Sequence, residues 1–194
     1  MGNHPLGWMA AMSMVMASPA SAAINQKVLP VEVCVVAPRV QPLAEVDAFG
    51  VVPTARPRLV VLEPLQEIRI LRQGQPAWKR LGSPSQPIST PLDWPTAPIA
   101  PNELVLLQLR PLKAAPEAFA HVQLSGASAS RMRSTQQLIQ RLGSHGKAWL
   151  QAFEAALVSD DVPLAWSLLF HPRSPRTSDL IILRQEVIRR GCGP

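Results

Sequence analysis

The stretch that decides the fold is Glu67–Leu81, with the sequence EIRILRQGQPAWKRL. Charged and apolar side chains alternate over residues 67–72, which is the period of a strand with one buried face. The turn signal Gln73-Gly74-Gln75 follows, because glycine readily adopts the positive φ angles of a tight hairpin. Residues 77–81 supply the returning strand. The stretch therefore predicts a β-hairpin.

Further strand patterns lie on both sides of this hairpin. We expect strands over residues 31–36, 58–62, 103–110 and 119–124, the last two forming a second hairpin. Proline recurs every few residues from Pro30 to Pro116, so the links between strands read as turns and loops. About six short strands joined in this way favour an antiparallel sandwich.

The pattern changes after residue 127. No proline occurs from Ser128 to Lys147, and apolar residues recur at helical spacing. We expect four helices. The first ends at Gly143, and the second covers residues 149–157. The third starts at the cap Asp160-Asp161 before Pro163, and the fourth runs from about 174–178 to Gly191. We interpret four aromatic residues on these helices as one core cluster: Trp149, Phe153, Trp166 and Phe170.

These patterns predict the α+β class. We expect an antiparallel β-sandwich-like N-terminal domain over residues 24–126 and a small α-helical domain of helix-hairpin type over residues 127–194. No segment after residue 22 is long and apolar enough to span a membrane, so no transmembrane span is expected in the mature chain.

Residues 1–22 are expected to be a signal peptide. The apolar window 5–17 is shorter than the ~20 residues of a membrane-spanning helix, and Ala20-Ser21-Ala22 matches the A-x-A pattern of a cleavage site. We expect cleavage after Ala22 or Ala23, and a periplasmic, thylakoid-lumenal or extracellular location. Against this, no Lys or Arg precedes Lys27, whereas signals normally open with a basic residue. The alternative is an apolar N-terminal helix of a cytoplasmic protein.

The chain contains two cysteines, Cys34 and Cys192. In an oxidising compartment an even number of cysteines favours a disulfide. The bond would close a loop of about 160 residues and stabilise the fold by about 4 to 5 kcal/mol. The alternative is two separate thiols, with Cys34 in the core.

The net charge is +6, which attracts anionic partners without specificity. The basic pairs and near-pairs along the chain are interpreted as solvated faces: Lys79-Arg80, Arg131-x-Arg133 and Arg189-Arg190. No nucleic-acid partner is expected for an exported protein.

We identify no catalytic, cofactor-binding or metal-binding residue. The histidines of the mature part, His121, His145 and His171, lack the paired spacing of metal ligands. The segment 143–147 lacks the spacing of a phosphate-binding loop and is interpreted as a helix connector. Asp160-Asp161 is interpreted as a helix cap rather than a pair of catalytic carboxylates.

Residues 67–72, 77–80, 92–95, 101–103 and 107–111 together resemble one half of a fibronectin type III or immunoglobulin-like sandwich. The absence of tyrosine departs from that family, because it removes the tyrosine corner. Residues 149–169 resemble a helical-repeat hairpin. The whole chain, with Gly191-Cys192 near its end, is similar in style to small exported cyanobacterial proteins of unknown function, a resemblance that implies no activity.

The functional expectation is an exported, non-catalytic protein that binds another macromolecule, a protein or an anionic polymer, or supports an assembly. The alternative is an exported hydrolase or metal-dependent enzyme with a site built from the three histidines and nearby acids.

Overall fold

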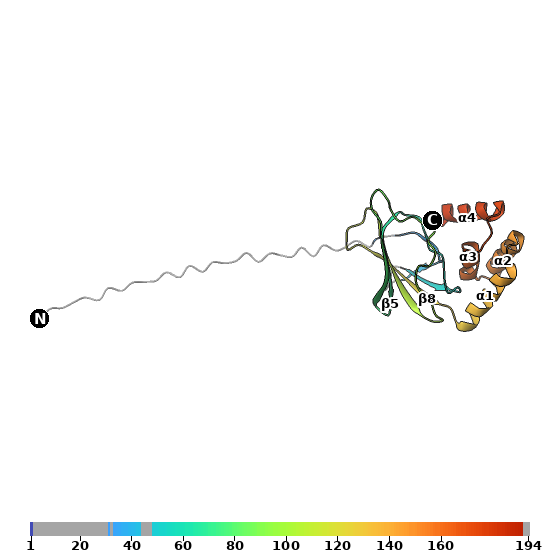
Figure 1. Cartoon of the computed structure of the whole chain (residues 1–194), viewed down its shortest axis with the longest axis horizontal. Helices are drawn as coiled ribbons and strands as arrows, with labels where there is room; N and C mark the ends of the chain where they lie inside the picture. The colour runs from blue at the N-terminus through green and yellow to red at the C-terminus, as the bar shows by residue number, and fades with distance from the viewer. Residues whose placement is uncertain (2–30, 32, 44–47, 192–194) are drawn as a thin grey trace.

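The computed structural model describes residues 1, 31, 33–43 and 48–191 of the 194-residue chain. Beyond Met1, the expected signal peptide lies outside the described residues. The described strands all precede residue 127 and the described helices all follow it (Figure 1). The α+β class is therefore confirmed.

The described strands are β1 (Val35–Ala37), β2 (Gln41–Pro42), β3 (Ala48–Val52), β4 (Val60–Val61), β5 (Leu65–Arg72), β6 (Gln75–Leu81), β7 (Leu104–Pro111) and β8 (Ala120–Gly126). The described helices are α1 (Ala129–Leu142), α2 (Gly146–Val158), α3 (Val162–Leu169) and α4 (Ser178–Arg190). None of these helices combines the length and apolar character that crossing a bilayer requires.

Both predicted hairpins are confirmed. β5 and β6 pair antiparallel, with Arg72 opposite Gln75. The two residues between them, Gln73 and Gly74, have φ angles of 49° and 76°. Two positive φ angles define the turn whose twist matches that of the flanking strands. β7 and β8 also pair antiparallel.

The expectation of a purely antiparallel sheet is wrong. Six strands form one mixed sheet in the order β2-β3-β8-β7-β5-β6, and β3 runs parallel to β8. Parallel neighbours need a long crossover, and the chain between β3 and β8 provides it with β4 to β7. Hairpin patterns are local, so they carried no information about a pairing between Ala48 and Val122.

The sandwich arrangement is not confirmed, because the second sheet is only the two-stranded ribbon β1–β4. This ribbon lies between two hydrophobic clusters. Val35 and Val61 pack into the core of the large sheet, whereas Val36 and Val60 pack among the helices. Burial on both faces explains why this part of the sequence is apolar without clear alternation.

The predicted aromatic cluster is confirmed. Trp149, Phe153 and Phe170 are buried in the helical cluster, and Trp166 packs partly buried against it. The rings of Phe153 and Trp166 lie 6.2 Å apart. These aromatic residues are therefore part of the core between helices and ribbon.

The predicted boundaries of α1 and α3 are set by the capping residues that the sequence analysis identified. The Asp161 carboxylate accepts a hydrogen bond from the Leu164 N–H at 3.1 Å, and Pro163 lies in the first turn of α3. Arg131 forms an ion pair with the same carboxylate. Gly143 ends α1 at a φ of 52°. The capping and connector interpretations are thus confirmed.

One carboxylate is buried in the large sheet. Glu67 on β5 is 3% exposed and accepts hydrogen bonds from Arg69 at 2.6 Å and Arg110 at 2.7 Å. Lys79 on β6 forms an ion pair with it at 3.0 Å. The cluster connects three adjacent strands, and the Arg69 guanidinium lies 4.4 Å from the centre of the Phe119 ring.

Candidate functional site

A seam runs between residues 54–58, which follow β3, and the helices α1, α3 and α4. It contains three adjoining hollows of about 290, 10 and 210 Å³. The small hollow shares Thr54, Arg56 and His171 with the first, and Arg58 and Phe170 with the last. We define the arginine seam by the arginines that line these hollows: Arg56, Arg58, Arg173, Arg176 and Arg184.

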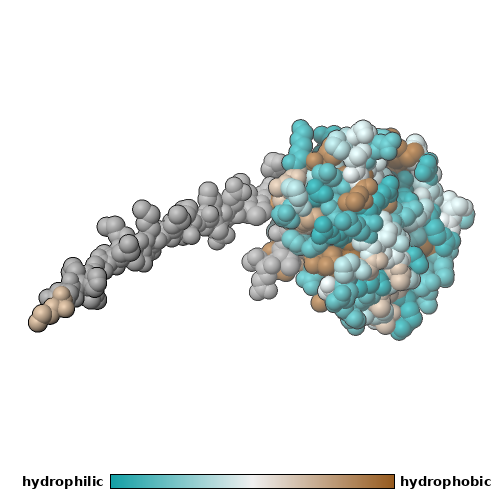
Figure 2. All heavy atoms as spheres, turned by 60° about the vertical axis from the view of Figure 1, so that its left-hand side comes forward, coloured by the Kyte–Doolittle hydropathy of each residue, from teal (hydrophilic) through white to brown (hydrophobic). Residues whose placement is uncertain are grey.

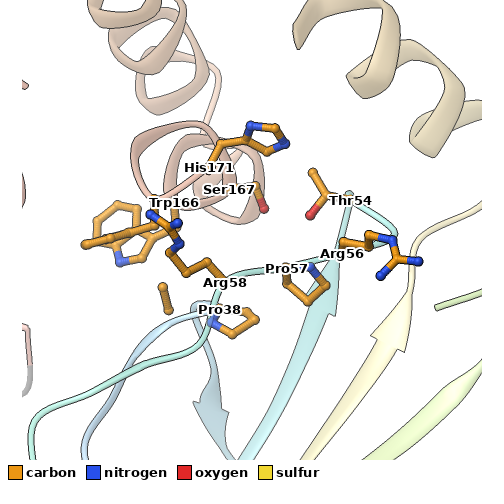
Figure 3. A pocket seen from close by; sticks show the side chains of 10 residues that line it. Pro38, Thr54, Arg56, Pro57, Arg58, Trp166, Ser167 and His171 are labelled. Carbon is orange, nitrogen blue, oxygen red and sulfur yellow. The ribbon is translucent and has the colours of Figure 1, made fainter. Parts of the chain in front are cut away.

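The middle of the seam is polar but narrow. Figure 3 shows the Thr54 and Ser167 hydroxyl groups facing each other, with Arg58 reaching towards Trp166 and Arg56 directed to the other side. The Trp166 indole N–H is buried and has no hydrogen-bond partner in the described part of the chain. The volume of about 10 Å³ corresponds to one water-sized site.

His171 lies at the junction of the small and the 290 Å³ hollows. Its ring stacks on Trp149 with 5.7 Å between ring centres, and its Nδ1 accepts a hydrogen bond from the Arg173 N–H at 3.1 Å. Burial, followed by the positive charges of Arg173 and Arg58, lowers the pKa of His171 to about 4. The imidazole is therefore neutral at pH 7.

Arg184 is held in place at the α4 end of the seam. Its Nε donates to the Leu169 carbonyl oxygen at 2.8 Å, and its Nη2 donates to Ser174 Oγ at 2.6 Å. Burial lowers the pKa of Arg184, and the charges of Arg58 and Arg176 act in the same direction. The positive charges at this end of the seam therefore repel one another.

Few acids offset these charges. Among the described residues, Asp93 is the one carboxylate that forms an ion pair with a seam arginine, and it does so with Arg58 at 2.7 Å. Figure 2 gives the hydropathy of one face of the whole molecule, on which hydrophilic residues predominate with hydrophobic ones scattered between them; it marks neither charge nor the seam. The seam thus combines hollow shape with an excess of positive charge, which is the electrostatic requirement for holding an anion.

Sequence reasoning missed this site because it searched for basic residues adjacent in the chain. Those clusters are partly neutralised in the structure: Arg189 and Arg190 pair with Glu186, Lys79 with Glu67, and Arg131 with Asp161. The seam arginines come instead from residues 56–58, 173–176 and 184. The local signals in the sequence are Arg56-x-Arg58 and Arg173-x-x-Arg176.

The three histidines lie on different elements. His121 is on β8 with its Nε2 3.3 Å from Gln108 Nε2, His145 precedes α2, and His171 follows α3. Among the described residues, no three His, Cys, Asp or Glu side chains are placed to hold one metal ion. Cys34 is partly buried, and its N–H donates to Glu63 at 2.9 Å, whereas Cys192 lies outside the described residues, so the disulfide stays a prediction.

The fold and site together define an α+β protein with an arginine-lined seam between a mixed sheet and a group of helices. Comparison with known proteins found no matching family model, curated protein or solved structure. The resemblance to a fibronectin type III or immunoglobulin-like sandwich therefore stays a prediction.

The low pKa of His171 predicts a pH dependence of stability. Between pH 6.5 and 4 the unfolded chain binds a proton at this position that the folded protein does not, so stability falls as the pH drops through this window. His171→Phe keeps a ring against Trp149 and removes the titration. We expect the loss of unfolding free energy between pH 7 and 4.5, measured in urea, to be smaller in the variant. Equal losses in the two proteins would contradict the prediction.

Proposed function

We propose that this protein is an exported, non-catalytic binding module that holds an anionic macromolecule along the arginine seam. The observation that carries the proposal is the convergence of five arginines from three separate segments, with Asp93 as their one described ion-pair partner. Such an excess of one sign of charge in a cleft raises the local concentration of opposite charge.

The architecture is part of the proposal. The sandwich-like domain over residues 24–126 is supported by a hydrophobic cluster built from that range alone. The helix-hairpin domain over 127–194 is supported by a second cluster, which also includes Val36, Ala37 and Val60 of the ribbon. The seam would then lie where the two domains meet, a common location for binding sites. Export rests on the sequence of residues 1–23 alone.

Heparin chromatography of the full chain tests the binding proposal. The wild type is expected to elute above physiological salt, about 0.15 M, with retention that falls steeply as salt rises. The triple variant Arg56→Gln, Arg173→Gln and Arg176→Gln is expected to elute at clearly lower salt. All three side chains are exposed, so the substitutions should leave the fold intact.

The matched control is the triple variant Arg80→Gln, Arg133→Gln and Arg141→Gln. It removes the same charge from exposed positions outside the seam. We expect it to elute close to the wild type. Equal shifts in the two triple variants, or elution of the wild type at or below physiological salt, would show that the seam is not a binding site.

A further inference from the structure

The 210 Å³ hollow at the α4 end of the seam has the features of a site for one charged group. Three arginines line it, Arg58, Arg176 and Arg184, together with Ser174. Its volume is below the roughly 300–1,000 Å³ of sites that enclose a whole drug-sized ligand. The hollow therefore suits an end group or side group of a larger molecule.

The arginines keep hydrogen-bond donors available. Arg184 uses Nε and Nη2 within the protein, to Leu169, Ser174 and Pro175, and no described residue accepts from its Nη1. Arg58 is held through Nε by Asp93, and its two Nη nitrogens donate to no described residue. Two of the guanidinium groups are thus fixed by contacts on one edge, which reduces the ordering cost of binding.

The charge balance selects the ligand. Three guanidinium groups and one carboxylate, Asp93 at 2.7 Å from Arg58, leave an excess of two positive charges. A phosphate monoester carries about −1.5 to −2 at pH 7, whereas a carboxylate or a sulfate ester carries a single charge. A sulfate ester has the same three terminal oxygens, but the second charge of the phosphate makes each hydrogen bond from the guanidinium donors stronger.

The remaining wall of the hollow is apolar and includes Val60, Phe170 and Ile188. Such a wall would contact the carbon skeleton to which the ester is attached. Resting on the function proposed above, we infer that this hollow binds a phosphate monoester carried by the anionic partner. Burial lowers the pKa of Arg184, and the repulsion from Arg58 and Arg176 lowers it further; a bound dianion would relieve that repulsion.

Calorimetric titration of the full chain at low salt and pH 7.5 tests the inference with three probes: phenyl phosphate, phenyl sulfate and benzoate. We expect phenyl phosphate to bind at least about tenfold more tightly than the other two, since its second negative charge strengthens each hydrogen bond from the guanidinium groups. Its affinity should fall below pH about 6, where the ester takes up a proton. Vesicles of phosphatidylcholine with phosphatidic acid identify the source of the ester. Binding to these vesicles indicates a lipid headgroup, and binding of phenyl phosphate without binding to the vesicles indicates a soluble ester.

Arg176→Gln is the decisive variant, because Arg176 forms no ion pair or hydrogen bond in the described part of the chain and its loss should not disturb folding. We expect it to weaken phenyl phosphate binding by about tenfold or more. Arg133→Gln, at an exposed position outside the seam, is the control and should have little effect.

Equal affinities for the three probes, equal effects of the two variants, or no binding of phenyl phosphate would overturn the inference. Heparin retention that persists in such a case would leave the function proposed for the seam intact. Loss of heparin retention together with specific phenyl phosphate binding would contradict the proposal that the seam binds an anionic polymer. It would leave the inferred phosphate site intact.

Discussion

Glu67→Gln is expected to lower the free energy of unfolding by about 3 to 5 kcal/mol at pH 7. Glu67 is 3% exposed, and its carboxylate contacts Arg69, Arg110 and Lys79 at 2.6, 2.7 and 3.0 Å. An uncharged amide leaves these cations without their shared counter-ion. Removing one member of a buried charged cluster costs much more than breaking a surface ion pair.

Urea denaturation of wild type and variant measures this effect. Glu154→Gln, at an exposed position on α2, is the matched control and should change the free energy by less than about 0.5 kcal/mol. A loss below about 1 kcal/mol for Glu67→Gln would mean that the cluster contributes no more than a surface pair.

The same cluster predicts that the free energy of unfolding falls at acidic pH. Burial alone would raise the pKa of Glu67, but the hydrogen bonds from Arg69, Arg110 and Lys79 outweigh it and lower the pKa from 4.5 to about 2. Because the pKa is depressed in the folded state, this contribution is complete above pH 4.5 and is lost as the pH falls towards 2. The loss amounts to about 3 kcal/mol, and Glu67→Gln should not show it. This window overlaps the His171 window only between pH 4.5 and 4, so the His171 effect is measured above pH 4.5 and the Glu67 effect below pH 4.

Cys34→Ser is expected to lower the free energy of unfolding by about 4 to 5 kcal/mol under non-reducing conditions, on the proposal that Cys34 and Cys192 form a disulfide. The residues beside the two cysteines support the proposal. A Cβ placed on Gly191 would lie 3.0 Å from Val36 Cγ2, and Arg39 Nη1 donates to the Gly191 carbonyl oxygen at 3.2 Å. The end of α4 therefore lies against the chain that follows Cys34.

Three variants and a thiol count test the cross-link. Cys34→Ser, Cys192→Ser and the double variant should be equally destabilised, because each removes the same bond. Denatured mature wild type should show no titratable thiol without reductant. Two titratable thiols, or losses in the single variants that add in the double variant, would show that the cysteines act separately.

Much of the local structure was predictable from residue patterns. The alternation in residues 67–72 and the Gln73-Gly74 turn predicted the β5–β6 hairpin, and Asp161 with Pro163 predicted the start of α3. These features depend on interactions between residues near in sequence, such as positive φ angles in a turn or a side chain capping a backbone N–H.

The parallel pairing of β3 with β8 and the assembly of the seam were decided only by tertiary structure. Neither leaves a periodic signal, because both join segments far apart in the chain: Ala48 with Val122 in the sheet, and Arg58 with Arg176 and Arg184 in the seam. The sequence by itself determined the two hairpins, the helical segments and their apolar faces, whereas it gave no sign of β2 or β3. Which arginines share one hollow was decided by how those faces packed together, since charges dispersed along a chain act jointly only when folding brings them close.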